Sequence, residues 1–188
     1  SVAPEVLEGV DAVINLGGLS SDPTAEYNPE ATYKINTEAT REMAIACKAK
    51  GIRRYIFASS CSVYDKGVLE DDANLLQTEE SDITPTATYA KSKYDAERSL
   101  IDLADDDFCP VMLRKGTIYG FSPRQRFDLV VNTFLKDAFS SGELNLHLGG
   151  EMWRPLLEIR DAARAYIACM EAPEDKVRGE IFNVVHQN

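Results

Sequence analysis

Short apolar runs that alternate with helical segments constrain the fold of this 188-residue chain more than any other feature. Each run is too short for a helix and lies beside glycine or polar turn residues, so we interpret the runs as buried strands. These runs are residues 11–16, 54–59, 110–113 and 180–185. Strands that alternate with helices are typical of parallel βαβ units. The sequence therefore predicts an α/β fold in which helices cover both faces of a parallel sheet.

The predicted helices begin and end at residues suited to capping. Asn28 is a good N-cap, Pro29 suits the first helical position, and Gly51 suits the residue after a helix that ends at Lys50. Further helices are predicted at 88–104, 128–139 and 159–170, and an alternating pattern at 144–148 predicts a short strand. Because ligands bind beyond the carboxyl ends of such strands, we expect the functional residues to follow the strands directly.

Composition excludes several classes of protein. Hydrophobic residues make up 44% of the chain and charged residues 27%, and no segment has the ~20 apolar residues of a membrane helix. A formal net charge of −11 opposes non-specific binding to nucleic acid or to anionic membranes. The cysteines form no CxxC pair, and neither histidine lies at ligand spacing from one, which argues against a zinc site. We therefore expect a soluble, cytoplasmic protein without a metal, nucleic-acid or membrane partner.

Tyr89 and Lys93 form the strongest chemical signal in the sequence. They are four residues apart in the helix predicted at 88–104, so their side chains share one face. A tyrosine with its ordinary pKa of about 10 is a poor base, but a nearby ammonium group favours the phenolate and lowers that pKa. The pair is thus a candidate proton-transfer unit, although the same spacing is common on surface helices without any catalytic role.

Hydroxyl groups follow the strand predicted at 54–59. Ser59, Ser60 and Ser62 lie at the end of this strand, 27 to 30 residues before Tyr89. A hydroxyl at a strand end can form hydrogen bonds with a substrate oxygen and with the reactive phenol together. The alternative is that these serines satisfy the backbone of an ordinary turn.

Seven motifs, taken in order, give the chain a specific resemblance. The motifs are VINLGG at 13–18, KINT at 34–37, SSCSVY at 59–64, YAKSK at 89–93, LRKGTIYG at 113–120, WRPL at 153–156 followed by Asp161, and FNV at 182–184. From Val10 to Val185 the chain resembles the extended short-chain dehydrogenase/reductases, in particular the NAD-dependent nucleotide-sugar epimerase/dehydratase group. The resemblance implies a Rossmann-like parallel sheet with part of a small substrate-binding lobe.

The resemblance also implies catalytic roles. Tyr89 matches the catalytic acid or base, and Ser60 matches the catalytic serine or threonine. Lys93 matches the lysine that holds the nicotinamide ribose and lowers the pKa of the tyrosine. The implied reaction is a transient oxidation, in which a sugar hydroxyl gives its proton to Tyr89 while the carbon that bears it gives a hydride to NAD or NADP. The resulting keto intermediate is then reduced again.

Binding residues follow from the same resemblance. Small residues let the backbone approach a ligand, and a planar guanidinium can bind two phosphate oxygens. The expected cofactor-binding residues are Leu16, Gly17, Gly18, Asn36, Ser59, Tyr89, Lys93, Lys115 and Gly116. The expected substrate-binding residues, for a nucleotide sugar, are Ser62, Thr117, Arg126 and Arg154.

The chain departs from the family pattern before its first predicted strand. No glycine-rich loop precedes Asp11, and no acidic residue stands where the family selects between NAD and NADP. We expect that on the order of 60 residues, two βα units, are missing, so that the chain is truncated at the N-terminus. We also expect the isolated chain to bind NAD poorly, which a submicromolar dissociation constant measured by calorimetry would contradict.

Other departures concern the chemistry. Cys61 and Ser62 stand where dehydratases of the group carry an Asp-Glu pair, which favours an epimerase or a dehydrogenase. Asp65 replaces a common glycine, and Glu158 replaces a common histidine. The leading hypothesis is an epimerase of nucleotide sugars. The alternatives are a reductase or dehydrogenase of the same family, or a non-catalytic truncated member, which usually lacks the catalytic tyrosine or lysine.

Two expectations concern organisation. Residues 1–120 are expected to form the C-terminal part of an NAD-binding domain, and residues 121–188 to supply substrate-lobe segments that return to the sheet. Relatives often dimerise through two helices, which here are those beginning near Asn28 and Thr88. A homodimer is therefore one expectation, and ordinary packing of these helices on the sheet is the other.

Overall fold

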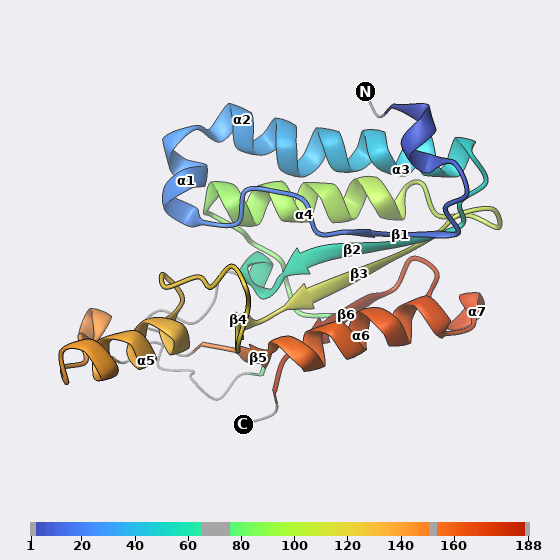
Figure 1. The fold of residues 1–188 in the computed structure, drawn as a ribbon. Helices are drawn as coiled ribbons and strands as arrows, with labels where there is room; N and C mark the ends of the chain where they lie inside the picture. Colours follow the sequence, from blue (N-terminus) through green and yellow to red (C-terminus); the bar gives the residue numbers. More distant parts are fainter. Residues whose placement is uncertain (1–2, 65–75, 151–153, 187–188) are drawn as a thin grey trace.

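A parallel sheet forms the centre of the computed structural model, which describes residues 3–64, 76–150 and 154–186 (Figure 1). In this described part the central sheet has four strands in the order β1-β2-β3-β6. The strands are β1 (Ala12–Asn15), β2 (Arg54–Ser60), β3 (Cys109–Lys115) and β6 (Ile181–Val184). All three pairings are parallel, which confirms the predicted sheet.

The register of the strands sets where the functional residues lie. Ser60 and Lys115, the last residues of β2 and β3, are direct partners, and Lys115 also faces Val184. β1 ends at Asn15, opposite Phe57, so the chain after β1 leaves the sheet beside the last residues of β2. The residues that follow all these strands therefore gather at one edge of the sheet.

One helical layer covers the upper face of the sheet in Figure 1. It consists of α1 (Asp22–Tyr27), α2 (Pro29–Tyr33), a π-helical segment (Lys34–Glu38), α3 (Ala39–Ala49) and α4 (Thr88–Ile101). The side chain of Asn28 accepts a hydrogen bond from the Ala31 N–H, 3.0 Å away, so the predicted N-cap is confirmed. Apolar side chains of α3 and α4, such as Cys47 and Leu100, pack against Tyr55 and Phe57 of β2.

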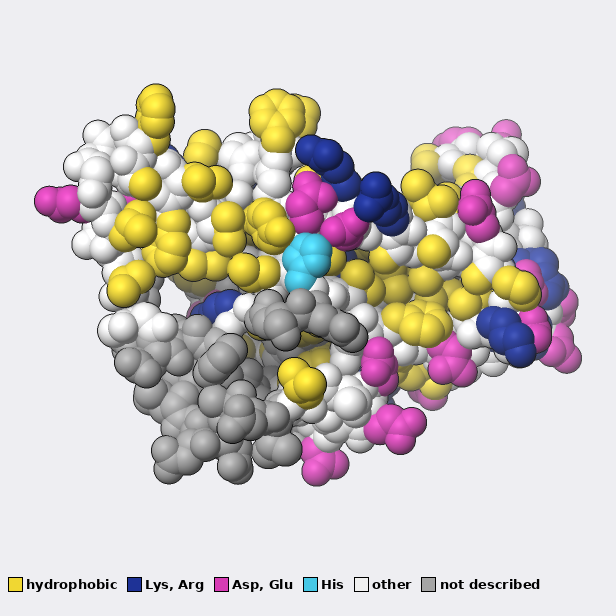
Figure 2. Space-filling model, turned by 90° about the horizontal axis from the view of Figure 1, so that it is seen from below, with side chains coloured by type: hydrophobic (Ala, Val, Ile, Leu, Met, Phe, Trp, Pro, Cys, Tyr) yellow, Lys and Arg dark blue, Asp and Glu magenta, His cyan; other side chains and the backbone are white. Residues whose placement is uncertain are grey.

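A second layer covers the opposite face. It consists of α6 (Ile159–Glu171) and α7 (Glu174–Val177), whose residues Tyr166 and Val177 pack with Ile56 and Leu113 of the sheet. Helices on both faces are therefore confirmed. Seen from below in Figure 2, hydrophobic side chains spread over much of the surface, with acidic side chains between them. None of the described helices is both long enough and apolar enough to cross a membrane.

The segment after β3 differs most from the sequence prediction. Two short strands, β4 (Thr117–Tyr119) and β5 (Leu156–Glu158), form a separate parallel pair, and α5 (Val130–Ser140) lies between them in sequence. The strand predicted at 144–148 is wrong, because 144–146 have no regular structure and a 3₁₀ helix covers His147–Gly150. Leu144 and Leu146 alternate in the sequence, but both side chains are exposed and bury no face. Further 3₁₀ helices cover Pro4–Leu7 and Cys61–Tyr64.

Candidate active site

Tyr89, Lys93 and Ser60 come together at the carboxyl edge of the sheet. Tyr89 and Lys93 lie one turn apart on α4, and Ser60 ends β2. The Lys93 ammonium group donates a hydrogen bond of 3.0 Å to the Ala58 carbonyl and lies 4.7 Å from the centre of the Phe57 ring. The Ser60 side chain lies near the Tyr89 hydroxyl and acts to lower the pKa of that phenol. The structure thus places the three expected catalytic side chains in one cluster.

The pKa of Tyr89 differs from the sequence expectation. Burial raises this pKa above its usual value, and the charge of Asp22 adds to the effect. The Ser60 side chain and the charge of Arg126 act in the opposite direction without reversing the shift. The expected lowering by Lys93 is therefore wrong for this structure, because burial disfavours the phenolate more strongly than nearby cations favour it.

The pKa of Lys93 is lowered to about 8, from an ordinary value of 10.5. Burial is the main cause, the charge of Lys115 adds to it, and Glu97 opposes it. The side chain of Lys93 is only 4% exposed, yet it has a good acceptor in the Ala58 carbonyl. Lys93 can therefore change its protonation state near neutral pH, next to a tyrosine that holds its proton.

A chain of hydroxyl groups leads away from Tyr89. The hydroxyl of Ser62 donates to that of Ser60 over 2.9 Å, and the Ser62 N–H also points to Ser60 Oγ, 3.2 Å away. The short 3₁₀ helix after β2 produces this geometry, because it turns Ser62 back towards the strand end. Ser60, which lies near Tyr89, is thus oriented by Ser62.

Two adjacent glycines and a buried asparagine shape the loop after β1. Asn36 is fully buried; its side chain bonds both backbone groups of Leu19 and donates 2.9 Å to the Ser92 hydroxyl on α4. Gly18 has a φ of +141°, and a Cβ there would lie 2.7 Å from Asn36 Oδ1 and 3.3 Å from Lys93 Nζ. Only glycine fits this close approach. The loop therefore presents bare backbone beside Lys93, and the adjacent Leu16 side chain is 64% exposed.

A buried ion pair lies directly beneath the catalytic cluster. Glu97 of α4 and Arg114 of β3 are 0% and 2% exposed, with Arg114 Nη2 and Nε at 2.7 and 3.0 Å from the carboxylate oxygens. The hydroxyl of Ser59 also donates to this carboxylate. Ser59 was expected to bind the cofactor, but its side chain is buried and bonds to Glu97. The Cys61 thiol donates to the Arg114 carbonyl over 3.2 Å. Both neighbours of Ser60 are thereby held by the ion pair.

The network continues towards β6. Arg114 Nη1 donates to the Tyr64 hydroxyl over 2.9 Å, and that hydroxyl donates to Asn183 Oδ1 over 2.7 Å.

Sequence reasoning missed Glu97, because a glutamate within a helix usually faces solvent. The signal was its position four residues after Lys93 and eight after Tyr89, on the same helical face. Burial raises the pKa of the Cys61 thiol to about 12, so this cysteine is protonated and packs in the interior.

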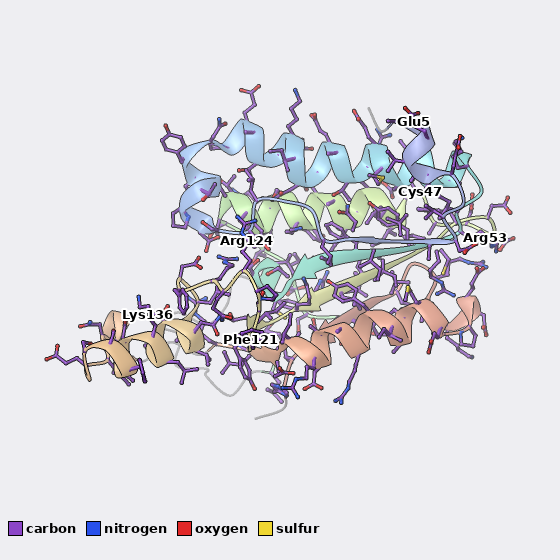
Figure 3. All side chains as sticks on the ribbon, viewed as in Figure 1. Glu5, Cys47, Arg53, Phe121, Arg124 and Lys136 are labelled. Atoms are coloured by element: carbon purple, nitrogen blue, oxygen red, sulfur yellow. The ribbon has the colours of Figure 1, made fainter. Side chains whose placement is uncertain are left out.

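The expected substrate-binding residues lie around the rim of the cluster. Arg126 donates to the Asp128 carboxylate over 2.5 and 3.0 Å and to the Ser20 hydroxyl over 3.0 Å, joining the loop after β4 to the loop after β1. Arg124 lies at the same end of the sheet, opposite the end that carries Arg53 (Figure 3). The Thr117 N–H donates to the Pro155 carbonyl over 2.7 Å.

Other residues expected to bind the cofactor or the substrate make structural contacts or lie away from the catalytic cluster. A Cβ at Gly116 would come within 2.7 Å of the Pro155 carbonyl oxygen, so this glycine permits the contact between β4 and β5. Arg154 is exposed and forms no ion pair with any residue that the structure describes. Glu158 caps α6 by accepting a hydrogen bond of 2.7 Å from the Arg160 N–H. Asp65 and Trp153 lie outside the described residues.

Comparisons with known proteins agree with this arrangement. Residues 3–184 match the NAD dependent epimerase/dehydratase family. An uncharacterized UDP-glucose epimerase, YtcB of Bacillus subtilis, is 27% identical over 183 residues, which are 95% of this chain and 54% of the relative. The trifunctional enzyme RHM2 of Arabidopsis thaliana, which includes a UDP-glucose 4,6-dehydratase, is 28% identical over 181 residues, 95% of this chain and 26% of that protein.

Solved structures give the same result. The structure of MoeE5 in complex with UDP-glucose and NAD superimposes with a TM-score of 0.84 at 25% identity. The match covers 98% of this chain and 60% of that one. The chain thus spans about half of the first curated relative and about a quarter of the second.

Proposed function

The chain belongs to the NAD-dependent epimerase/dehydratase family, and from that premise we propose that its site epimerises a nucleotide sugar by transient oxidation. One observation carries the proposal: the Tyr89 hydroxyl lies near enough to Ser60 for that serine to lower its pKa, one helical turn from the buried Lys93 ammonium group. A phenol, a hydroxyl and an amine in this order can exchange a proton with a sugar hydroxyl. The neutral, protonated phenol is the resting form, because burial raises its pKa.

The residues around the cluster fit the nicotinamide ribose half of NAD. The backbone at Gly18 is bare and lies beside Lys93, so ribose hydroxyls could approach both the amine and the Tyr89 phenol. Lys93 and Tyr89 would hold these hydroxyls, and the backbone at Lys115 and Gly116 would line the nicotinamide. When bound, the cofactor supplies a hydride acceptor that later returns the hydride.

Each catalytic side chain then has a separate task. Ser60 positions the sugar hydroxyl and the Tyr89 phenol by hydrogen bonding to both. Tyr89 accepts the hydroxyl proton in its phenolate form, the minor form at rest, as the carbon is oxidised, and the resulting phenol gives the proton back on reduction. The positive charge on Lys93 stabilises the phenolate before the proton is accepted and after it is returned. The buried pair of Glu97 and Arg114 joins α4 to β3, and the bond from Ser59 to Glu97 joins α4 to β2, so these contacts hold the elements that carry the catalytic side chains together.

Charge and local chemistry favour epimerisation over dehydration. A 4,6-dehydratase needs a further acid and base beside the catalytic hydroxyl, and here those positions hold Cys61 and Ser62. The Cys61 thiol has a pKa of about 12 and donates to a backbone carbonyl, so it is unsuited to either task. Arg124, Arg126 and Arg154 supply positive charge for a nucleotide diphosphate in a chain whose formal net charge is −11.

An assay of the natural protein that contains this chain, with NAD and UDP-glucose, tests the proposal. We expect an epimeric UDP-hexose, detected by proton NMR, without net accumulation of reduced cofactor. The Tyr89→Phe variant should lose the activity, whereas Tyr33→Phe, which changes an exposed tyrosine of α2, should retain it. Stoichiometric reduced cofactor would indicate a dehydrogenase instead, and a 4-keto-6-deoxy product would contradict the assignment.

Three further proposals concern the domain organisation, the oligomeric state and the cellular compartment. We propose that residues 1–120 belong to the cofactor-binding unit, and that 121–188 contribute substrate-side segments before β6 returns to the sheet. The exposed apolar residues Tyr33, Ile35 and Ile45 support a homodimer through the helices of the upper layer. Four free cysteine thiols fit a reducing compartment such as the cytoplasm. Light scattering of the purified protein tests the dimer.

A further inference from the structure

The side chain of Lys115 lies beside the catalytic hydroxyl. Ser60 and Lys115 are direct partners in the parallel pair of β2 and β3, and direct partners in such a pair point to the same face of the sheet. The preceding partners, Ser59 and Arg114, point towards α4, as their bonds to Glu97 show. Because side chains alternate along a strand, Ser60 and Lys115 project together towards the opposite side of the sheet, where α6 lies.

None of the described residues supplies a negative charge that would balance the Lys115 amine. Its Nζ atom lies 5.6 Å from the centre of the Tyr166 ring of α6. The Tyr166 hydroxyl is buried and has no hydrogen-bond partner, so it does not compensate the charge either. Among the residues that the structure describes, Lys115 forms no salt bridge, whereas Arg114 and Arg126 are paired with Glu97 and Asp128.

An unpaired cation at this position is costly for the protein alone. Burial lowers the pKa of Lys115 to about 8, from an ordinary value of 10.5. The positive charge of Lys115 in turn contributes to the lowered pKa of Lys93. Two ammonium groups thus act on each other, and the charge of Glu97 only partly offsets this effect at Lys93. Burying a charge without its counter-charge is unfavourable, so a ligand that supplies an anion here would gain binding energy.

We propose that the Lys115 ammonium group binds a carboxylate carried by the sugar, so that the substrate class is a nucleotide-linked hexuronate. This inference rests on the proposed function and specifies its substrate. The carboxylate of such a sugar lies a few bonds from the ring hydroxyls, which matches the adjacency of Lys115 and Ser60. The Tyr166 ring supports the amine by a cation–π contact and keeps it in place.

Charge distinguishes this anion from the other groups that would enter the site. The carboxamide of a nicotinamide is neutral and the oxidised ring is cationic, so the nicotinamide end of the cofactor would not compensate Lys115. A nucleotide diphosphate is anionic, but the arginines at the rim of the cluster, Arg124 and Arg126, already provide for it. A carboxylate beside the reacting hydroxyl is the remaining partner of opposite charge.

Calorimetric titration of the protein with UDP-glucuronate and UDP-glucose tests the proposal. At a pH below the Lys115 pKa of about 8, we expect the wild-type protein to bind the uronate about tenfold more tightly than UDP-glucose. Lys115→Met should abolish this preference. Lys115→Arg, which keeps the charge, should retain part of the preference. Lys91→Met, which removes an exposed lysine of α4, is the matched control and should behave like the wild type.

The preference should also depend on pH through Lys115. The protonated amine binds a carboxylate, so the preference is present below its pKa and is lost as the pH rises through it. Lys93 of α4 and Tyr166 of α6 face Lys115, and Lys93 titrates in the same range. The pH profile of the wild type must therefore be compared with that of Lys115→Met, in which Lys93 alone remains.

The outcomes separate the two proposals. Equal affinity for the two sugars, or a preference that survives in Lys115→Met, overturns the assignment of Lys115 while the proposed function stands. Failure of both nucleotide sugars to bind overturns both proposals. The Cε resonance of Lys115 gives a second measurement that needs no nucleotide. Its titration midpoint should rise when free glucuronate is added and should not move with glucose, and an unmoved midpoint in both solutions also overturns the assignment.

Discussion

Replacing Arg114 by methionine is the most informative perturbation of this fold. The substitution leaves the Glu97 carboxylate fully buried, without the bonds of 2.7 and 3.0 Å that it accepts from the guanidinium group. Ser59 remains its one described donor, and the Tyr64 hydroxyl loses its donor as well. Breaking a buried ion pair by removing one partner costs about 3–5 kcal/mol. A domain is stable by only about 5–15 kcal/mol, so we predict a large loss.

Urea unfolding followed by circular dichroism measures this loss. The exposed pair of Arg164 and Asp161, joined at 2.9 Å with side chains 78% and 40% exposed, provides the control. Arg164→Met should change the free energy of unfolding by less than about 1 kcal/mol, because such pairs are largely screened by solvent. Arg114→Lys, which keeps the charge but loses the bidentate geometry, should fall between the two if Arg114→Met fails to fold.

A double-mutant cycle decides whether the loss belongs to the pair. The variant that combines Glu97→Gln with Arg114→Met contains no unpaired charge, so it should be destabilised by less than the sum of the single variants. We expect a coupling free energy of about 2–3 kcal/mol, the upper part of the range for residues in one network. An Arg114→Met variant no less stable than Arg164→Met, or additive single effects, would refute the reasoning.

Three further predictions follow from local geometry. Between pH 8 and 10.5 the unfolded chain holds a proton that Lys115 of the folded chain has lost. The contribution of Lys115 to the free energy of unfolding should therefore rise with pH by up to about 3 kcal/mol, measured as the difference between the wild type and Lys115→Met in urea unfolding, and a difference that does not change with pH would contradict this. Gly18→Ala should lower the free energy of unfolding by about 1–3 kcal/mol, because the new Cβ would lie 2.7 Å from Asn36 Oδ1. Gly142→Ala should lower it less, because φ is +74° there but no described atom lies within 4 Å of the new Cβ. Equal losses of the two variants in urea unfolding would contradict this prediction. Cys61 should resist thiol reagents at mildly alkaline pH until the protein unfolds, because its pKa is about 12, and rapid labelling of the native protein would show otherwise.

The central layers could be predicted from the sequence because their signals are local. The run predicted at 54–59 is the strand Arg54–Ser60, and the helix predicted at 88–104 is Thr88–Ile101. β4 and β5 could not be predicted, because strands of three residues are too short to show a period. They exist because they pair with each other across a long stretch of sequence, which no local pattern records.

The site was accessible to sequence reasoning only in part. The positions of Ser60, Tyr89 and Lys93 could be expected, because motif spacing and helical periodicity bring them together. The direction of the Tyr89 pKa shift could not, because it depends on burial, which is a property of the packed structure. The ion pair of Glu97 and Arg114 was hidden for the same reason, since its meaning comes from the surrounding core.

Isotopic labelling tests the central claim most directly, namely that Tyr89 and its neighbours support transient oxidation of a sugar carbon. The protein is incubated with NAD and UDP-glucose that carries deuterium on its ring carbons, and the product is analysed by NMR and mass spectrometry. We predict an epimeric product that retains deuterium at the inverted carbon, because the hydride returns to the carbon from which it left. A product in which solvent hydrogen has replaced that deuterium, or no epimer at all, would contradict the claim.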